Sequence, residues 1–359
     1  MASPPLAKIG VISIGDMGMG IAKLLIANGF SVATNCKGRS DETLERAKSA
    51  QVEICTSDEQ LTEACDVILS VVPPRDATAT AQRIVDAVTG PIRRDVSGGR
   101  EPLYFADLNA VAPSTVRSIA ALFEQTRGQV RFLDGAIIGA PPKPSTITTT
   151  TTTTTEEPSG SSSSGGGGGG GGGGDDGSGS GPVPGWSVPN VPMSGPHRLA
   201  AVPGYGAALA AALNARHVSD EVGAASGLKM CFASLTKGFT SLAVQSFTTA
   251  RRLGVLDELR EELRDVVPAH GRAAERGVVG MPPKAYRWVR EMEEIALAFD
   301  EDGGFPPDLF RAVADVYRAV ADDTVLGREK VGARQRGLDV DDVAAAMAEG
   351  LENKRKKND

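Results

Sequence analysis

Apolar and polar positions alternate along the first 135 residues in blocks that predict strands separated by helices. An apolar run over residues 9–14 stops at a cluster of glycines, a helical spacing continues to Asn28-Gly29, and residues 30–34 are apolar again. Further apolar runs, separated by helical patterns, occupy residues 52–55, 67–72, 103–108 and 130–134. This alternation predicts an α/β Rossmann-type fold, a doubly wound parallel sheet covered on both faces, with ligands at the carboxyl ends of its strands.

The second half of the chain has mainly helical spacing. A long and mostly apolar helix is predicted over residues 224–253, and further helices at 256–266, 285–299, 307–320 and 340–351. We therefore expect a nucleotide-binding domain in residues 1–222 and an all-α domain in residues 223–359. The long helix should be buried on most sides. Its apolar stripe fits a contact with a second copy of the chain or a core within one chain, and consists of Phe232, Leu235, Phe239 and Leu242.

A segment of low complexity interrupts the first domain. Residues 148–155 are all threonine, and residues 159–181 are nearly all glycine and serine. Such a composition cannot bury enough apolar area to offset the entropy of ordering. We predict a disordered surface insertion over residues 145–182, because fold-like sequence resumes directly after it.

Composition excludes several classes of protein. A formal net charge of -7 disfavours nucleic acid as a partner, and no apolar run approaches the length needed to cross a membrane. The four cysteines have no metal-binding or C-x-x-C spacing, and with three histidines a metal site is not expected. The first strand starts near Lys8, which leaves no room for a cleaved signal peptide. We expect a cytoplasmic protein in a reducing compartment.

The glycines after the first strand predict a phosphate-binding turn. They form the sequence Gly15-Asp16-Met17-Gly18 between a strand and a helix. A side chain at the glycines would keep the backbone away from a pyrophosphate, whose charge is stabilised by the helix N-terminus. Ser13 occupies the first position of the G-x-G-x-x-G register. The alternative is a glycine turn that only packs the helix on the sheet.

The end of the second strand indicates which dinucleotide is bound. NAD-binding domains place an acidic residue there, whereas cations suit the 2′-phosphate of NADP. From the end of this strand no acidic residue occurs until Asp41, so NADP is favoured over NAD, although a solvated basic loop would look similar. The side chains suited to the phosphate are those of Asn35, Lys37, Arg39 and Ser40. Other strand ends expected to border the cofactor carry Val72, Pro73 and Asn109.

Several motifs together resemble the β-hydroxyacid dehydrogenase superfamily, which includes 3-hydroxyisobutyrate and 6-phosphogluconate dehydrogenases. The resemblance is closest to the 6-phosphogluconate dehydrogenase C-terminal domain-like proteins and covers nearly the whole chain outside the insertion. The motifs are the glycine turn, Val71-Val72-Pro73-Pro74, Asp107-Leu108-Asn109, residues 134–140 and Gly223-Ala224-Ala225-Ser226-Gly227-Leu228-Lys229-Met230.

The resemblance implies that Lys229 is the catalytic acid/base, which protonates or deprotonates the substrate oxygen during hydride transfer. Burial would lower the pKa of this lysine towards the working pH, as an acid/base requires. Without the resemblance, a lone lysine near a helix start is more often a solvated surface residue. The family also implies a homodimer formed through the helical domain.

The chain departs from its relatives at positions that bind the substrate. Ala233 replaces an asparagine four residues after the lysine, and Ile138 with Gly139 stands where the family has a Ser-Gly-Gly loop. Phe232 and Thr236 replace a histidine and a glutamate, which makes phosphogluconate an unsuitable substrate. Lys237 is a further substrate-binding candidate because it lies two helical turns after Lys229, and a packing or surface role would suit it as well. Glu293-Glu294 replaces a late Lys-Asp pair.

The function expected from these residues is that of an NADP-dependent oxidoreductase. It would transfer hydride between NADP(H) and a small hydroxy acid or carbonyl compound, with a lysine as acid/base. An imine substrate is a close variant, since it would need no carboxylate contact at Ile138 or Ala233. The alternative from another class is a non-catalytic NADP-binding redox sensor or scaffold.

Overall fold

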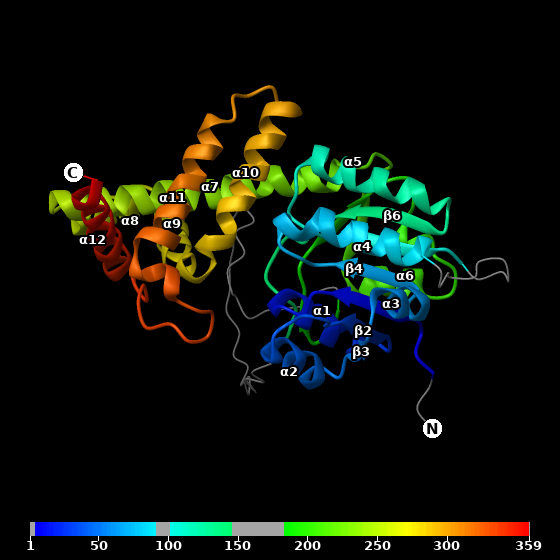
Figure 1. Ribbon diagram of the computed structural model, residues 1–359. Coiled ribbons are helices and arrows are strands. Elements are labelled where there is room, and N and C mark those ends of the chain that lie inside the picture. Colours follow the sequence, from blue (N-terminus) through cyan, green and yellow to red (C-terminus); the bar gives the residue numbers. More distant parts are fainter. Residues whose placement is uncertain (1–3, 91–100, 146–182, 359) are drawn as a thin grey trace, which may run out of the picture.

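The computed structural model describes residues 4–90, 101–145 and 183–358 (Figure 1). The predicted insertion therefore lies, apart from Ser145 itself, outside the described residues. Within these residues an α/β part built on one large sheet is followed by a purely helical part. The long helix α7 (Ala224–Leu253) starts against the sheet and runs out along the helical part.

The large sheet has eight strands in the order β10-β9-β6-β5-β4-β1-β2-β3. The order reverses between β1 and β4, and this switch point is where doubly wound sheets bind ligands. The sheet confirms the predicted doubly wound fold. Its strands are β1 (Lys8–Ile12), β2 (Ser31–Asn35), β3 (Glu53–Cys55), β4 (Val67–Ser70), β5 (Leu103–Asp107), β6 (Val130–Gly135), β9 (Val191–Ser194) and β10 (Ala215–Ser219).

One pairing departs from the predicted all-parallel sheet, because β9 runs antiparallel to β6, with Asp134 opposite Ser194. The chain between them forms the small two-stranded sheet of β7 (Lys143–Pro144) and β8 (Trp186–Ser187). The sequence does not predict β9 as a strand, because Pro192 interrupts its short apolar run.

Apolar side chains project from both faces of the sheet, as the continuous apolar runs predict. On β4, Val67 and Leu69 join one core cluster, whereas Ile68 joins the cluster on the other face. The first cluster includes residues of α1 and α6, and the second includes residues of α3, α4 and α5. The helices of this part are α1 (Asp16–Ala27), α2 (Asp41–Ser49), α3 (Asp58–Ala64), α4 (Ala77–Thr89), α5 (Pro113–Leu122) and α6 (Gly206–Ala212).

The helical part contains one helix that the spacing did not predict, α9 (Pro268–Gly280). Its glycines obscure the helical pattern but allow close packing, since a Cβ on Gly277 would lie 2.6 Å from Oγ1 of Thr240 on α7. A short 3-10 turn, η4 (Pro282–Lys284), joins α9 to the next helix. The other helices are α8 (Leu256–Val266), α10 (Ala285–Glu301), α11 (Asp308–Asp323) and α12 (Val340–Asn358).

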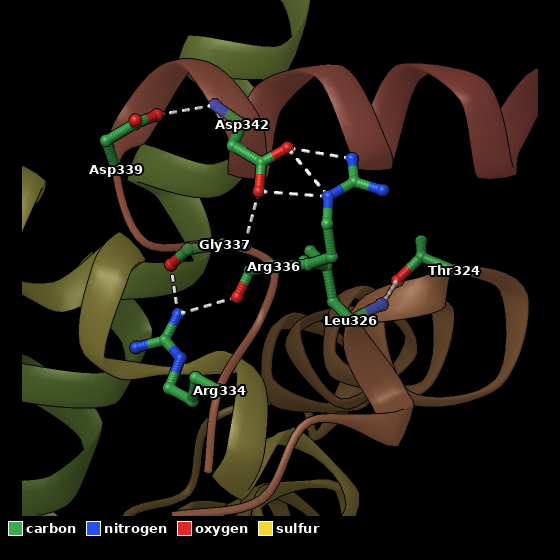
Figure 2. A network of polar contacts seen from close by, with 7 residues as sticks. All are labelled: Thr324, Leu326, Arg334, Arg336, Gly337, Asp339 and Asp342. Carbon is green, nitrogen blue, oxygen red and sulfur yellow. Dashed lines mark hydrogen bonds and ion pairs between the residues drawn. The ribbon is translucent and has the colours of Figure 1, made fainter. Parts of the chain in front are cut away.

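A network of polar contacts fixes the loop that leads into α12 (Figure 2). The carboxylate of Asp342 pairs with the guanidinium of Arg336, 2.7 Å apart, and accepts the backbone N–H of Gly337. The carboxylate of Asp339 accepts the N–H of Asp342 at 2.7 Å, in the manner of a helix N-cap. The guanidinium of Arg334 donates to the backbone carbonyls of Arg336 and Gly337 in the same loop.

The expectation that α7 is buried on most sides is wrong. Leu235 is 77% exposed and Leu242 is 56% exposed, and Leu228 and Phe232 are also exposed. Only Phe239 of the stripe packs against the apolar core of the helical part, whereas its other three residues are exposed. Among the described helices, none combines the length and the apolar character that a membrane span requires.

Candidate functional site

The glycine turn lies between β1 and α1 and has the geometry that a phosphate requires. A Cβ on Gly18 would lie 1.8 Å from the carbonyl oxygen of Ser13, so only glycine allows α1 to pack this closely on the end of β1. A Cβ on Gly15 would meet no atom within 4 Å, so the backbone before α1 is open to a ligand. Asp16 and Met17 form the first turn of α1. The residues present thus fit a dinucleotide pyrophosphate.

A pocket connects the glycine turn to the end of β2. Four predicted cofactor residues lie in it, namely Gly15, Asn35, Lys37 and Arg39. The Oδ1 atom of Asn35 accepts the N–H of Lys37 at 2.9 Å and so shapes the basic loop. The hydroxyl of Ser40 accepts the N–H of Thr43 and so caps the N-terminus of α2. Ser40 therefore has a structural role in addition to its predicted role in cofactor binding.

Two arginines of this pocket were missed in the sequence, Arg46 and Arg83. Nε of Arg46 donates to the carbonyl of Ile14 at 3.1 Å, which places its guanidinium beside the glycine turn. Arg83 binds Asp58 through two nitrogens, and Asp58 in turn accepts from Asn35. In the sequence, Arg46 is one of several charged residues of a predicted helix. Its position six residues after Ser40 is the one local indication that it faces the end of the strand.

Asn109 joins the ends of β4 and β5. Its Oδ1 accepts the N–H of Val72 at 2.7 Å, and its Nδ2 donates to Ser70 and to the fully buried Asp107. Burial raises the pKa of Asp107 to about 7. The amide of Asn109 is therefore used within the protein, where it fixes the segment that carries Val72 and the exposed Pro73.

Lys229 lies at the carboxyl end of β6. Its Nζ donates to the carbonyl oxygen of Ile137 at 2.5 Å, two residues beyond the strand. The start of α7 is fixed there by Asp134, whose carboxylate accepts the N–H of Gly223 at 2.9 Å and the hydroxyl of Ser226 at 2.7 Å. Burial raises the pKa of Asp134 above its ordinary value, and these hydrogen bonds offset only part of that shift.

The loop after β6 contacts both Lys229 and α1. Ile138 pairs with Asn190 through two backbone hydrogen bonds, and Gly139 has a φ of +138°, which favours glycine. A Cβ on Gly20 of α1 would lie 2.8 Å from the carbonyl oxygen of Pro142. The loop thus packs on the helix that begins at the glycine turn. Lys229 and the pyrophosphate turn consequently share one edge of the sheet.

The ammonium of Lys229 is easy to deprotonate. Burial, and then the positive charge of Arg287, lowers the pKa of Lys229 to about 8. A group with such a pKa is present in both protonation states near neutral pH, as general acid/base chemistry requires. Around it, groups of three or more possible metal ligands are absent from the described part of the chain.

The other predicted substrate residues lie further along α7. Ala233 is 2% exposed and belongs to the apolar core of the helical part, so the alanine fills space there. The side chain of Lys237 is mostly buried and forms an ion pair with Glu291 on α10. Ala233 follows Lys229 by one turn of α7, while its side chain packs in the apolar core of the helical part.

The predicted replacements Glu293 and Glu294 have different surroundings. Glu293 pairs with Arg290 and Arg318 near the surface. Glu294 is 1% exposed and accepts the N–H of Ala112 at 2.8 Å and the hydroxyl of Thr115 at 3.0 Å. This carboxylate joins α10 to the N-terminus of α5, and so connects the helical part to the sheet part.

Fold and site together define a dinucleotide-binding sheet with an appended helical part and a lysine at the shared edge. Two family models match the chain. One, described as "NADP oxidoreductase coenzyme F420-dependent", matches residues 8–92, and a domain of unknown function, DUF1932, matches residues 250–320. The first model agrees with the predicted oxidoreductase class and the predicted cofactor.

Individual relatives extend this likeness to most of the chain. An "Uncharacterized 28.5 kDa protein in 7S RNA 5'region" of Methanothermus fervidus is 22% identical over 258 residues, 72% of this chain and 76% of the relative. The conserved protein MTH1747, described as similar in structure to 3-hydroxyacid dehydrogenases, is 24% identical with a TM-score of 0.54, over 88% of this chain and 97% of its own. The 3-hydroxyisobutyrate dehydrogenase (ygbJ) of Salmonella typhimurium is 15% identical with a TM-score of 0.56, over 94% and 99%. The fold resembles that of the β-hydroxyacid dehydrogenase superfamily, as the motifs predicted.

Proposed function

We propose that this protein is an NADP-dependent oxidoreductase of the β-hydroxyacid dehydrogenase type, with Lys229 as its acid/base. One observation carries the proposal: Nζ of Lys229 is 2.5 Å from the carbonyl of Ile137, at the same sheet edge as the glycine turn and the Arg39 pocket. The substrate class is a small hydroxy acid or carbonyl compound, or the related imine.

NADP(H), when bound, supplies or accepts the hydride. The open backbone at Gly15 and the start of α1 would hold the pyrophosphate, and Arg39 with Lys37 would hold the 2′-phosphate. Lys229 moves the proton: its ammonium donates to the substrate oxygen during reduction, and its amine accepts that proton during oxidation. The carbonyl of Ile137 orients Nζ for this transfer.

Replacement of the lysine tests the proposal. Lys229→Ala should abolish substrate-dependent consumption of NADPH across a panel of keto acids, aldehydes and cyclic imines, while the dissociation constant for NADPH stays within about threefold. Lys48→Ala, which changes an exposed lysine on α2, is the matched control. Normal turnover by Lys229→Ala would refute the assigned role.

The second candidate is a non-catalytic NADP-binding sensor or scaffold. The apolar residues Ile138 and Ala233 at positions where relatives have polar groups favour it. It becomes the better description if wild-type protein binds NADPH but consumes none with any compound of the panel.

We further propose a homodimer formed through the helical part, which we place at residues 223–359. The exposed residues Phe232, Leu235 and Leu242 of the stripe support this, because together with the exposed Leu228 they recur at spacings of three, four and seven residues along one side of α7. The free thiols Cys36, Cys55, Cys65 and Cys231 support a reducing compartment such as the cytoplasm.

A further inference from the structure

The helix α7, which carries Lys229, begins without a capping side chain of its own. Gly223 precedes the helix with a φ of +105°, a conformation that favours glycine, and so offers no side chain to the first N–H groups. Asp134, near the end of β6, caps the helix instead. One oxygen of its carboxylate accepts the N–H of Gly223 at 2.9 Å and the N–H of Ser226 at 3.3 Å.

A second strand completes the cap. Ser194 on β9 lies opposite Asp134 in the antiparallel pair, and its hydroxyl accepts the N–H of Ala225 at 3.0 Å. The hydroxyls of Ser194 and Ser226 both donate to the carboxylate of Asp134, each at 2.7 Å. The side chains of Asp134, Ser194 and Ser226 together form the α7 cap, and all three residues are 0% exposed.

The cap keeps a charge in a buried place. The surrounding N–H and O–H groups donate to Asp134, which suits an ionised carboxylate whose oxygens only accept. A helix N-terminus also favours negative charge. Because burial of a charge costs free energy, these contacts have to hold both segments closely for the carboxylate to remain ionised.

The same two segments meet again at Lys229. On α7, Lys229 follows Ser226 by three residues, and on the other segment Ile137 follows Asp134 by three residues. Nζ of Lys229 donates to the carbonyl oxygen of Ile137 at 2.5 Å. The end of β6 and the start of α7 are therefore joined at two points, first by the α7 cap and then by the lysine itself.

The contact of the lysine alone does not fix its ammonium group. A lysine side chain is a flexible stem of four carbons, so Nζ is placed only as precisely as the backbone from which it extends. The first turn of a helix frays when its N–H groups lack acceptors. A misplacement of about 1 Å can cost about 100-fold in rate.

We propose that the α7 cap positions Lys229, by holding the start of the helix so that Nζ stays at the carbonyl of Ile137. The three residues of the cap are buried, so they are positioning residues that act through the lysine and do not touch the substrate. Their effect on turnover rests on the proposed function, whereas their effect on the place of the ammonium group does not.

Removal of one hydroxyl from the cap tests the inference. Ser226→Ala should lower kcat for NADPH consumption about 10- to 100-fold and leave the dissociation constant for NADPH unchanged. Ser194→Ala, which removes the acceptor of the Ala225 N–H, is the second variant and should act in the same direction. Ser241→Ala is the matched control, because Ser241 is an equally buried serine of α7 whose hydroxyl donates to the carbonyl of Gly238.

A second measurement does not require turnover. The rate at which acetic anhydride acetylates Lys229, followed by mass spectrometry at a series of pH values, gives the pKa of this lysine. Burial is the first cause that lowers this pKa to about 8, so a looser helix start that admits water should raise it towards 10.5 in Ser226→Ala. In Ser241→Ala the pKa of Lys229 should keep its wild-type value.

A wild-type kcat together with an unchanged pKa of Lys229 in Ser226→Ala and Ser194→Ala would overturn the inference, even if both variants are less stable. The outcomes also separate the two proposals. A raised pKa of Lys229 in Ser226→Ala, in a protein that consumes no NADPH, would refute only the enzyme. Turnover that depends on Lys229 but is the same in Ser226→Ala as in wild type would refute only the positioning role.

Discussion

The buried carboxylate of Glu294 on α10 accepts the backbone N–H of Ala112, the residue that precedes α5, at 2.8 Å. The first N–H groups of a helix have no partner within it, and the helix N-terminus favours negative charge. The carboxylate of Glu294 provides both the hydrogen-bond acceptor and the negative charge, although Glu294 lies 182 positions after Ala112 in the chain. The orientation of the helical part relative to the sheet thus depends on a side chain that binds neither cofactor nor substrate.

Removal of this contact should loosen the two parts. Glu294→Ala leaves the Ala112 N–H and the Thr115 hydroxyl without a partner, and we expect the free energy of unfolding to fall by about 2–3 kcal/mol. Glu293→Ala, one residue earlier and nearer the surface, should change stability by less than about 1 kcal/mol. Urea unfolding of both variants measures the difference, and equal effects would contradict the role of Glu294.

The rate should depend on pH through Lys229. With a pKa of about 8, the ammonium that donates during reduction is lost above that pH, so kcat/KM for reduction should fall tenfold per unit at higher pH. For oxidation the amine is needed, and kcat/KM should rise up to about pH 8 and then level off. Arg287→Gln removes a neighbouring cation and should shift both midpoints upward. Profiles that stay flat between pH 7 and 9.5 would contradict this assignment.

Arg39 should select NADPH over NADH. Arg39→Ala removes a charged contact to the 2′-phosphate, so NADPH affinity should drop about 10- to 100-fold while NADH affinity changes less than threefold. Fluorescence titration with both nucleotides is the measurement. Arg75→Ala, an exposed arginine outside the pocket, is the control. Equal losses for the two nucleotides would show that Arg39 does not face the 2′-phosphate.

Asp107 should make stability decrease with pH. Its folded-state pKa of about 7 is raised above the ordinary value of 3.8, so the native state holds a proton that the unfolded state has released between these values. Stability from this group is fully present below about pH 4 and is lost as pH rises to about 7, at up to about 1.4 kcal/mol per unit. Asp107→Asn should remove that slope, whereas the exposed Asp257→Asn should keep it. Thermal unfolding between pH 4.5 and 7.5 provides the test.

The exposed stripe on α7 should be needed for self-association. Leu235→Glu places a charge at a position that is 77% exposed in the single chain, so the monomer should fold but the dimer should dissociate. Leu338→Glu, at an exposed leucine outside α7, is the matched control. Sedimentation velocity should show a monomer for the first variant only. A wild-type monomer at micromolar concentration would refute the proposed dimer.

Basic residues at strand ends can be predicted from the sequence, whereas those on helices cannot. Lys37 and Arg39 were found because they follow a strand directly, and strand ends meet at one edge whatever the rest of the chain does. Arg46 and Arg83 lie on helices, where a basic residue is usually solvated. Their contacts with Ile14 and Asp58 depend on how the helices pack, which the local sequence pattern does not determine.

The sequence by itself determined the doubly wound sheet, the glycine turn and the position of Lys229 on a long helix. These follow from apolar periodicity and from the backbone freedom of glycine, which are local properties. Only the tertiary structure decided that β9 runs antiparallel, that the stripe on α7 is exposed, and that Glu294 caps α5. Each of these depends on pairing between distant segments, because backbone groups and charges left unpaired by local structure find their partners only when the chain is packed.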